Sequence, residues 1–95
     1  MKTIAFSPAA EDDIGEIWHY SAERWGVEQA DSYTDAIRDA CHALAKGVKQ
    51  GRPVDVLPGA MKFLCGAHLI YFRDYPDRMD VIRILHGKQD AERHL

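Results

Sequence analysis

The sequence lacks the features that mark membrane, disulfide-stabilised and metal-binding proteins. Its 95 residues include only two cysteines, Cys41 and Cys65, which lie too far apart in sequence for a zinc or redox motif and are expected to be reduced. No apolar run approaches the roughly 20 residues that a membrane helix needs, and the N-terminal segment is too short for a signal peptide. The five histidines are scattered without the spacing of metal ligands. We therefore expect a cytoplasmic protein with no membrane association, no metal and no cofactor.

The sequence also lacks a concentrated excess of basic residues. Its formal net charge is −3, and the charge is unevenly distributed. Three basic and nine acidic residues lie between Met1 and Ala45, against nine basic and six acidic residues between Lys46 and Leu95. An acidic protein is poorly suited to displace counterions from a polyanion, so we expect no direct, sequence-specific nucleic-acid binding. The more basic second half could instead meet an acidic protein partner.

Two apolar runs in the last third of the chain are its most informative feature. Residues 67–73 and 81–86 are rich in β-branched and aromatic side chains, and residues 74–78 between them have turn chemistry, which predicts an antiparallel hairpin. Strand alternation assigns one face to the core and the other to a binding surface, because the second face mixes apolar side chains with two arginines. The predicted core face carries Ile70, Phe72, Ile82 and Ile84, and the predicted open face carries Leu69, Tyr71, Arg73, Val81, Arg83 and Leu85. An alternative that the pattern leaves open is that the two arginines pair with helix carboxylates.

The first half of the sequence predicts a strand followed by two helices. Residues 2–6 alternate weakly, and Ser7 and Pro8 then form a helix start whose apolar spacing continues to Gly26. A second helical pattern covers residues 30–45 and ends at Gly47, so the two helices form an antiparallel hairpin. Residues 46–58 indicate a loop with a short extended piece at 54–57, and residues 61–65 a strand. The result is one domain, residues 1–95, with an α+β fold of order β-α-α-β-β-β, in which the helices cover one face of a mostly antiparallel sheet and leave the other face open or covered by a partner.

This order and its residues resemble the ParE toxins of type II toxin-antitoxin systems, within the RelE/ParE superfamily. The closing strands and tail carry the most specific part of the match, at residues 68–73 and 82–87 with Asp90 and Leu95, and Gly51-Arg52 resembles the family's loop signature. The helical half matches at Asp13, Ile17, Tyr20, Trp25, Gly26, Ala30, Tyr33, Ile37, Leu44 and Ala45. The resemblance implies a toxin that inhibits DNA gyrase and is neutralised by a ParD-like antitoxin, with the two proteins assembled as a heterotetramer.

The main alternative is the RelE-like activity, ribosome-dependent cleavage of mRNA. Such cleavage needs a proton acceptor, cations beside the phosphate and a proton donor, and Arg73, Arg83 and His86 could fill these roles. Against it, the charges of Lys88 and Arg93 in the tail are balanced by acidic neighbours, which does not suit docking on a ribosome. We therefore predict a non-enzymatic inhibitor with no catalytic residue. The nuclease and a non-toxic binding module of the same fold remain as alternatives.

Two sets of residues are candidate binding sites. An acidic antitoxin segment that folds on binding is expected to use the open sheet face and two helical tryptophans, for which hairpin core is the alternative. The candidate antitoxin-binding residues are Leu69, Tyr71, Arg73, Val81, Arg83, Leu85, Trp18 and Trp25. The C-terminal tail, Lys88 to Leu95, with Arg83 and His86 near its base, is the candidate target-binding surface, because an exposed strand end and tail can reach a partner without disturbing the core. Its residues are Arg83, His86, Lys88, Arg93, His94 and Leu95.

Overall fold

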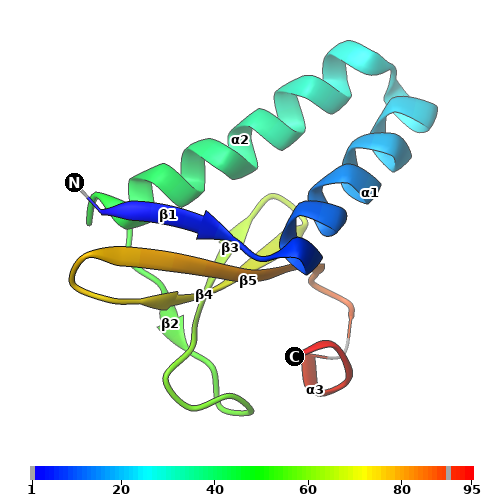
Figure 1. Cartoon of the computed structure of the whole chain (residues 1–95). Coiled ribbons are helices and arrows are strands. Elements are labelled where there is room, and N and C mark those ends of the chain that lie inside the picture. The colour runs from blue at the N-terminus through cyan, green and yellow to red at the C-terminus, as the bar shows by residue number, and fades with distance from the viewer. Residues whose placement is uncertain (1, 90) are drawn as a thin grey trace.

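The computed structural model describes residues 2–89 and 91–95 and consists of two long helices packed on a five-stranded sheet (Figure 1). The elements are β1 (Thr3–Phe6), α1 (Pro8–Trp25), α2 (Val27–Ala45), β2 (Arg52–Pro53), β3 (Met61–Cys65), β4 (His68–Asp74), β5 (Arg78–His86) and α3 (Ala91–His94). The strand order is β1-β5-β4-β3-β2, with β1 parallel to β5 and the other pairs antiparallel. No described helix is long and apolar enough to cross a membrane. The expected α+β fold with a mostly antiparallel sheet is confirmed.

The helical hairpin begins and turns at the residues that the sequence indicated. Ser7 caps α1, because its Oγ accepts a hydrogen bond of 3.0 Å from the Ala10 N–H, and Pro8 occupies the first turn. The Ser7 hydroxyl also donates to the Ile82 carbonyl at 2.6 Å, which fixes the start of α1 on β5. Gly26 alone separates the two helices, with φ at +93°, a conformation that a residue with a Cβ rarely adopts. A helix-to-helix turn of one residue is therefore available only to glycine here.

The prediction of a short extended piece at 54–57 is wrong. The strand that precedes β3 is the two-residue β2, Arg52–Pro53, paired with Lys62 and Met61. Residues 54–60 instead form a closed loop, in which the Val54 N–H donates to the Ala60 carbonyl and the Ala60 N–H donates to the Leu57 carbonyl. Pro53 cannot donate a ladder hydrogen bond, which helps to end the strand.

A register shift between β4 and β5 changes which side chains face the helices. Tyr71 pairs with Arg83 but Phe72 pairs with Val81, so Ile82 is the extra residue of a β-bulge. Val81 consequently joins Ile70, Phe72 and Ile84 in the main core under the helices, whereas Ile82 packs on the opposite side of the sheet. The predicted faces of Val81 and Ile82 are therefore both wrong, because simple alternation fails across a bulge.

The second face of the sheet is covered over β4 and β5 by other parts of the chain. Tyr71 and Leu85 are 3% and 1% exposed and form a second core, which we call the second cluster. Its members are Val54, Ala60, Tyr71 and Leu85, with Leu57, Leu69, Ile82, Ala91 and Leu95 packed against them. The loop at 54–60 and the tail with α3 lie on the side of the sheet away from the helices (Figure 1). The expectation of an open or partner-covered face is wrong for Tyr71 and Leu85, which apolar residues of the loop and tail cover, whereas Leu64 of β3, which pairs with Leu69 on the same face, is exposed.

The two arginines expected on the open face are both engaged within the chain. Arg73 donates to the Pro58 carbonyl at 3.2 Å and so holds the loop at 54–60 against β4. Arg83 is directed toward Asp13 on α1. The alternative left open by the sequence, in which an arginine pairs with a helix carboxylate, is therefore confirmed for Arg83 and not for Arg73.

Candidate functional site

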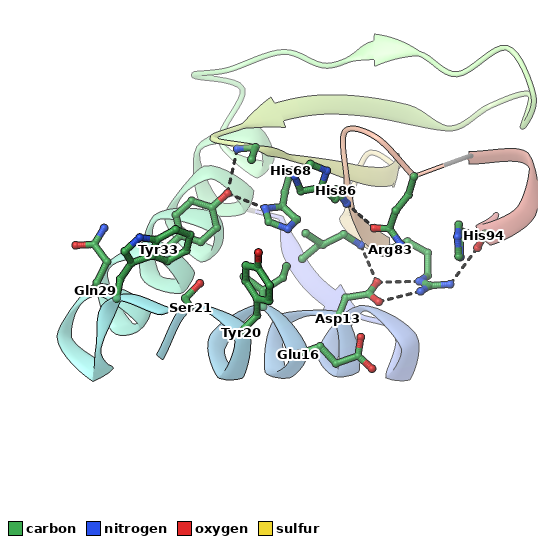
Figure 2. A pocket seen from close by; sticks show the side chains of 15 residues that line it. Asp13, Glu16, Tyr20, Ser21, Gln29, Tyr33, His68, Arg83, His86 and His94 are labelled. Carbon is green, nitrogen blue, oxygen red and sulfur yellow. Dashed lines mark hydrogen bonds and ion pairs between the residues drawn. The ribbon is translucent and has the colours of Figure 1, made fainter. Parts of the chain in front are cut away.

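A groove of about 780 Å³ lies between the helical hairpin and the adjoining ends of β4 and β5 (Figure 2). One wall comes from α1 and α2, the other from the strand ends, and the tail closes one end. The residues that line it are Asp13, Glu16, Ile17, Tyr20, Ser21, Trp25, Gln29, Tyr33, Ala67, His68, Arg83, Ile84, His86, Gln89 and His94. Its apolar floor includes Ile17 and Ile84, which also belong to the main core.

An ion pair between Asp13 and Arg83 lies at the tail end of the groove (Figure 2). Arg83 Nε and Nη2 donate to the two oxygens of Asp13, each at 2.8 Å, and the Ile84 N–H donates to Asp13 Oδ2 at 2.9 Å. Arg83 Nη1 also donates to the His94 carbonyl at 3.1 Å. The hydrogen bond to Asp13 raises the pKa of Arg83, although partial burial acts in the opposite direction. The pair therefore joins α1, β5 and the tail, and its guanidinium charge is already neutralised.

Tyr33 on α2 meets His68 and His86 at the strand ends (Figure 2). Tyr33 Oη lies 2.7 Å from His68 Nδ1 and accepts a hydrogen bond of 3.0 Å from the Ala67 N–H. The rings of His68 and His86 meet edge to face with centroids 5.3 Å apart, and His86 Nδ1 accepts from the Lys88 N–H at 3.1 Å. A Cβ at Gly66 would lie 2.7 Å from the Tyr33 hydroxyl, so glycine at this turn is what admits Tyr33.

Protonation of His68 is expected to destabilise the fold. Burial lowers the pKa of His68 below its ordinary value of 6.5, and His86 lowers it further, whereas Asp13 acts weakly in the other direction. Because the unfolded chain binds this proton more readily, the stability that neutral His68 contributes is complete above about pH 6.5 and is lost as the pH falls below it. We expect the urea midpoint to be lower at pH 5.5 than at pH 7.5.

The matched variants for this prediction are His68→Gln and His42→Gln. His42 is exposed on α2 and does not line the groove. The fall in midpoint between the two pH values should shrink in His68→Gln and persist in His42→Gln. An unchanged pH dependence in His68→Gln would assign the effect to another group.

Two exposed aromatic side chains form the rim at the far end of the groove. Tyr20 is 55% exposed and Trp25 is 62% exposed, and their rings meet edge to face with centroids 6.1 Å apart. The guanidinium of Arg24 lies 4.9 Å from the centre of the Tyr20 ring. Large aromatic side chains exposed beside a groove are typical of a binding surface. Trp18 does not line the groove, and its Nε1 donates to Asp31 on α2 at 2.7 Å.

The structure brings only some of the candidate residues together. Arg83 and Trp25 of the antitoxin-binding set line the groove, as do Arg83, His86 and His94 of the target-binding set. Tyr71, Val81 and Leu85 are buried, Leu69 and Leu95 pack at the second cluster, and Lys88 is exposed beside the groove. The binding roles given to these residues stay predictions, but a surface made by Tyr71, Val81 and Leu85 is not accessible in this structure.

Most of the groove residues, among them Asp13, Ile17, Tyr20, Tyr33 and His68, were not proposed as site residues from the sequence. Asp13, Ile17 and Tyr20 follow one another on one face of α1 at spacings of four and three, and Tyr33 continues the wall on α2. The sequence signal for this surface was the helical spacing, which places an acidic and an aromatic side chain on the same face of α1 as Ile17. His68 carried no local signal, since its partner Tyr33 is 35 residues away.

Neither cysteine lines the groove. No cluster of three or more metal-ligating side chains occurs within residues 2–89 and 91–95. Burial, with a contribution from Cys65, raises the pKa of Cys41 to about 12, and burial also raises the pKa of Cys65. Both thiols are free and remain protonated at neutral pH, so neither is an activated nucleophile.

Comparison with known proteins identifies the family. A family model described as the ParE toxin of the type II toxin-antitoxin system parDE matches residues 4–91. The chain belongs to the ParE toxin family. Toxin ParE1 of Mycobacterium tuberculosis (strain H37Rv) is 36% identical over 91 residues, which cover 94% of this chain and 93% of the relative. Toxin ParE1 of Caulobacter vibrioides is 34% identical over 96 residues, covering 100% of this chain and 99% of the relative.

Solved structures agree on the fold of this ParE family member. A structure described as the chromosomal ParDE TA system from P. aeruginosa has a TM-score of 0.78 at 20% identity, covering 90% of this chain and 96% of that one. A YoeB/ParE toxin from Agrobacterium tumefaciens has a TM-score of 0.63 at 18% identity over 92% and 99% of the two chains. A heterotetrameric YoeB-YefM toxin-antitoxin complex from Staphylococcus aureus has a TM-score of 0.59 at 10% identity over 92% and 98%. At these identities the similarity establishes the RelE/ParE-type fold.

Proposed function

We propose that this ParE toxin stops growth by binding DNA gyrase without catalysing a reaction, and that a ParD-like antitoxin holds it inactive. The match of residues 4–91 to the ParE toxin of parDE systems carries the proposal. The curated relatives named Toxin ParE1 support it, because they align over nearly the whole chain. The heterotetramer described for the YoeB-YefM proteins makes a similar assembly of this toxin with its antitoxin a reasonable expectation.

The engagement of Arg83 favours a binding protein over a nuclease. A cation that stabilises a pentacovalent phosphate must be free to approach it, and the guanidinium of Arg83 is held by both oxygens of Asp13. His86 Nδ1 is likewise occupied by the Lys88 N–H. Inhibition of gyrase needs only complementary contact, for which these fixed side chains are suited.

The groove is the surface that we assign to the antitoxin. The sheet face predicted for this role is largely covered at the second cluster, whereas the groove keeps Tyr20 and Trp25 exposed beside a partly apolar floor. Arg83, His86 and His94 belong both to this groove and to the candidate target-binding surface. An antitoxin lying in the groove would therefore cover part of the target-binding surface, which accounts for neutralisation by competition.

Expression in bacteria tests this proposal. Induction of the toxin alone should arrest growth and relax a reporter plasmid, and co-expression with the antitoxin from the same operon should restore both. Arrest with normal plasmid supercoiling would contradict gyrase as the target. No arrest on induction would favour the non-toxic binding module.

A second candidate, ribosome-dependent mRNA cleavage, is favoured by one observation. Tyr33, His68 and His86 place several proton donors and acceptors within one groove, as general acid-base catalysis requires. Primer extension on message from a translation reaction distinguishes the two functions. Cuts that depend on added toxin and disappear in His86→Gln would support the nuclease, and intact message supports the inhibitor.

Removal of the tail residues 93–95 is expected to abolish growth arrest while antitoxin binding persists. The tail is held by the Arg83 bond to the His94 carbonyl and by packing of Leu95. Its removal eliminates three of the six proposed target-binding residues and leaves the aromatic end of the groove intact. Full toxicity after this truncation would reject the tail. Near-ultraviolet circular dichroism reports whether the fold survives, and Lys88→Glu, an exposed charge reversal, tests the same surface without disturbing the second cluster.

A further inference from the structure

The groove has a length and polarity that fit a segment of polypeptide. Its wall on α1 runs from Asp13 to Trp25, which at 1.5 Å per residue is about 18 Å, the length of three helical turns or of about five extended residues. Its two ends differ. Tyr20 and Trp25 make the hairpin end aromatic, and the Asp13–Arg83 pair with Glu16 makes the tail end charged.

Among the lining residues at the charged end, the carboxylates of Asp13 and Glu16 outnumber the single guanidinium of Arg83. The charge of Arg83 is neutralised by Asp13, and its guanidinium N–H groups donate to Asp13 and to the His94 carbonyl. Glu16 is exposed and lies four residues before Tyr20 on the same face of α1. It forms no salt bridge among the residues that the structure describes, although its charge helps to raise the pKa of Arg83. An acidic segment would meet repulsion from Glu16 and a cation that is already paired. A basic side chain would gain a carboxylate partner.

We propose that the antitoxin segment that fills this groove is apolar with a basic residue, which pairs with Glu16 while apolar side chains pack on Ile17 and against Tyr20 and Trp25. Figure 2 shows Glu16 and Tyr20 on α1 below the cluster of Tyr33 and His68. The inference deepens the proposed function and rests on its antitoxin. It replaces the expectation of an acidic antitoxin segment, which depended on two arginines being free on an open sheet face.

Charge variants of the toxin test this inference. Dissociation constants for the operon-encoded antitoxin would be measured by titration calorimetry at 50 and 300 mM salt, with the wild-type toxin, Glu16→Gln and Glu16→Lys. Glu28→Lys is the matched control, because Glu28 is also an exposed helical carboxylate but does not line the groove. We expect Glu16→Lys to bind about tenfold more weakly at low salt, Glu16→Gln less so, and Glu28→Lys to bind as the wild type does. High salt should reduce these differences.

Charge exchange identifies the partner residue. Each lysine and arginine of the antitoxin would be replaced by glutamate in turn, and one of these variants should restore binding to Glu16→Lys while weakening binding to the wild-type toxin. Equal or tighter binding of the unmodified antitoxin to Glu16→Lys would overturn the inference in favour of an acidic segment. Near-ultraviolet circular dichroism of Glu16→Lys is expected to match the wild type, since Glu16 is exposed.

Other occupants of the groove give different results. If the groove holds a second copy of the toxin, sedimentation will show a dimer of the free toxin that Glu16→Lys dissociates. If it holds the target, Glu16→Lys will lose gyrase inhibition and retain antitoxin binding. Either result overturns the inference. Failure of the wild-type toxin to bind its antitoxin would instead contradict the proposed function itself.

Discussion

Replacement of Asp13 by alanine is expected to lower the free energy of unfolding by about 3 kcal/mol, which is typical when one partner of a largely buried ion pair is removed. Asp13 is only 7% exposed and accepts three hydrogen bonds, two from Arg83 and one from the Ile84 N–H. Its loss leaves the guanidinium and the strand N–H without their acceptor. Urea denaturation followed by circular dichroism measures the change.

Two further variants show whether the ion pair is responsible. Asp12→Ala changes an exposed neighbour on the same helix and should alter stability by less than about 0.5 kcal/mol. The double variant Asp13→Ala with Arg83→Met should be less destabilised than Asp13→Ala alone, because no unpaired guanidinium then remains. Equal stability of Asp13→Ala and Asp12→Ala would contradict the structural role of the pair.

Replacement of Leu85 by alanine is expected to cost about 3 kcal/mol of unfolding free energy, as for other large-to-small changes in cores. Leu85 is 1% exposed and packs with Tyr71, Val54 and Ala60 in the second cluster. If this face were instead an open docking surface, the same change would leave the free toxin's stability nearly unaltered and weaken only partner binding. The urea midpoint of the free toxin therefore distinguishes a self-covered face from an open one.

Leu64→Ala is the matched control for this prediction. Leu64 lies on β3 and is 58% exposed, so its truncation should change stability by less than about 0.5 kcal/mol. A destabilisation of Leu85→Ala no larger than that of Leu64→Ala would show that the loop and tail do not cover the sheet in solution.

Local signals in the sequence predicted the elements, and non-local packing explains what the sequence did not reveal. Ser7, Pro8 and Gly26 act through their own backbone and capping chemistry, so the helical hairpin was predictable. The bulge near Ile82 was not, because it depends on the pairing of β5 with both β4 and β1. A single inserted residue then exchanged the faces of Val81 and Ile82, which alternation alone could not foresee.

The candidate site was predicted only in part for the same reason. Trp25 and His86 were proposed from sequence and do line the groove. Arg83 was proposed as a binding residue, with pairing to a helix carboxylate left open, and the sequence could not show that its partner is Asp13, 70 residues away. Tyr33 and His68 also meet only through the packing of α2 on the sheet. Each of these pairs is a tertiary contact between residues with no shared local pattern.

A gyrase supercoiling assay with the purified toxin is the sharpest test of non-catalytic gyrase inhibition. We predict that the toxin blocks supercoiling of relaxed plasmid, that the block increases up to a fixed toxin-to-gyrase ratio, and that the antitoxin relieves it. Full gyrase activity in the presence of excess folded toxin, in a preparation that cleaves message on translating ribosomes, would contradict it.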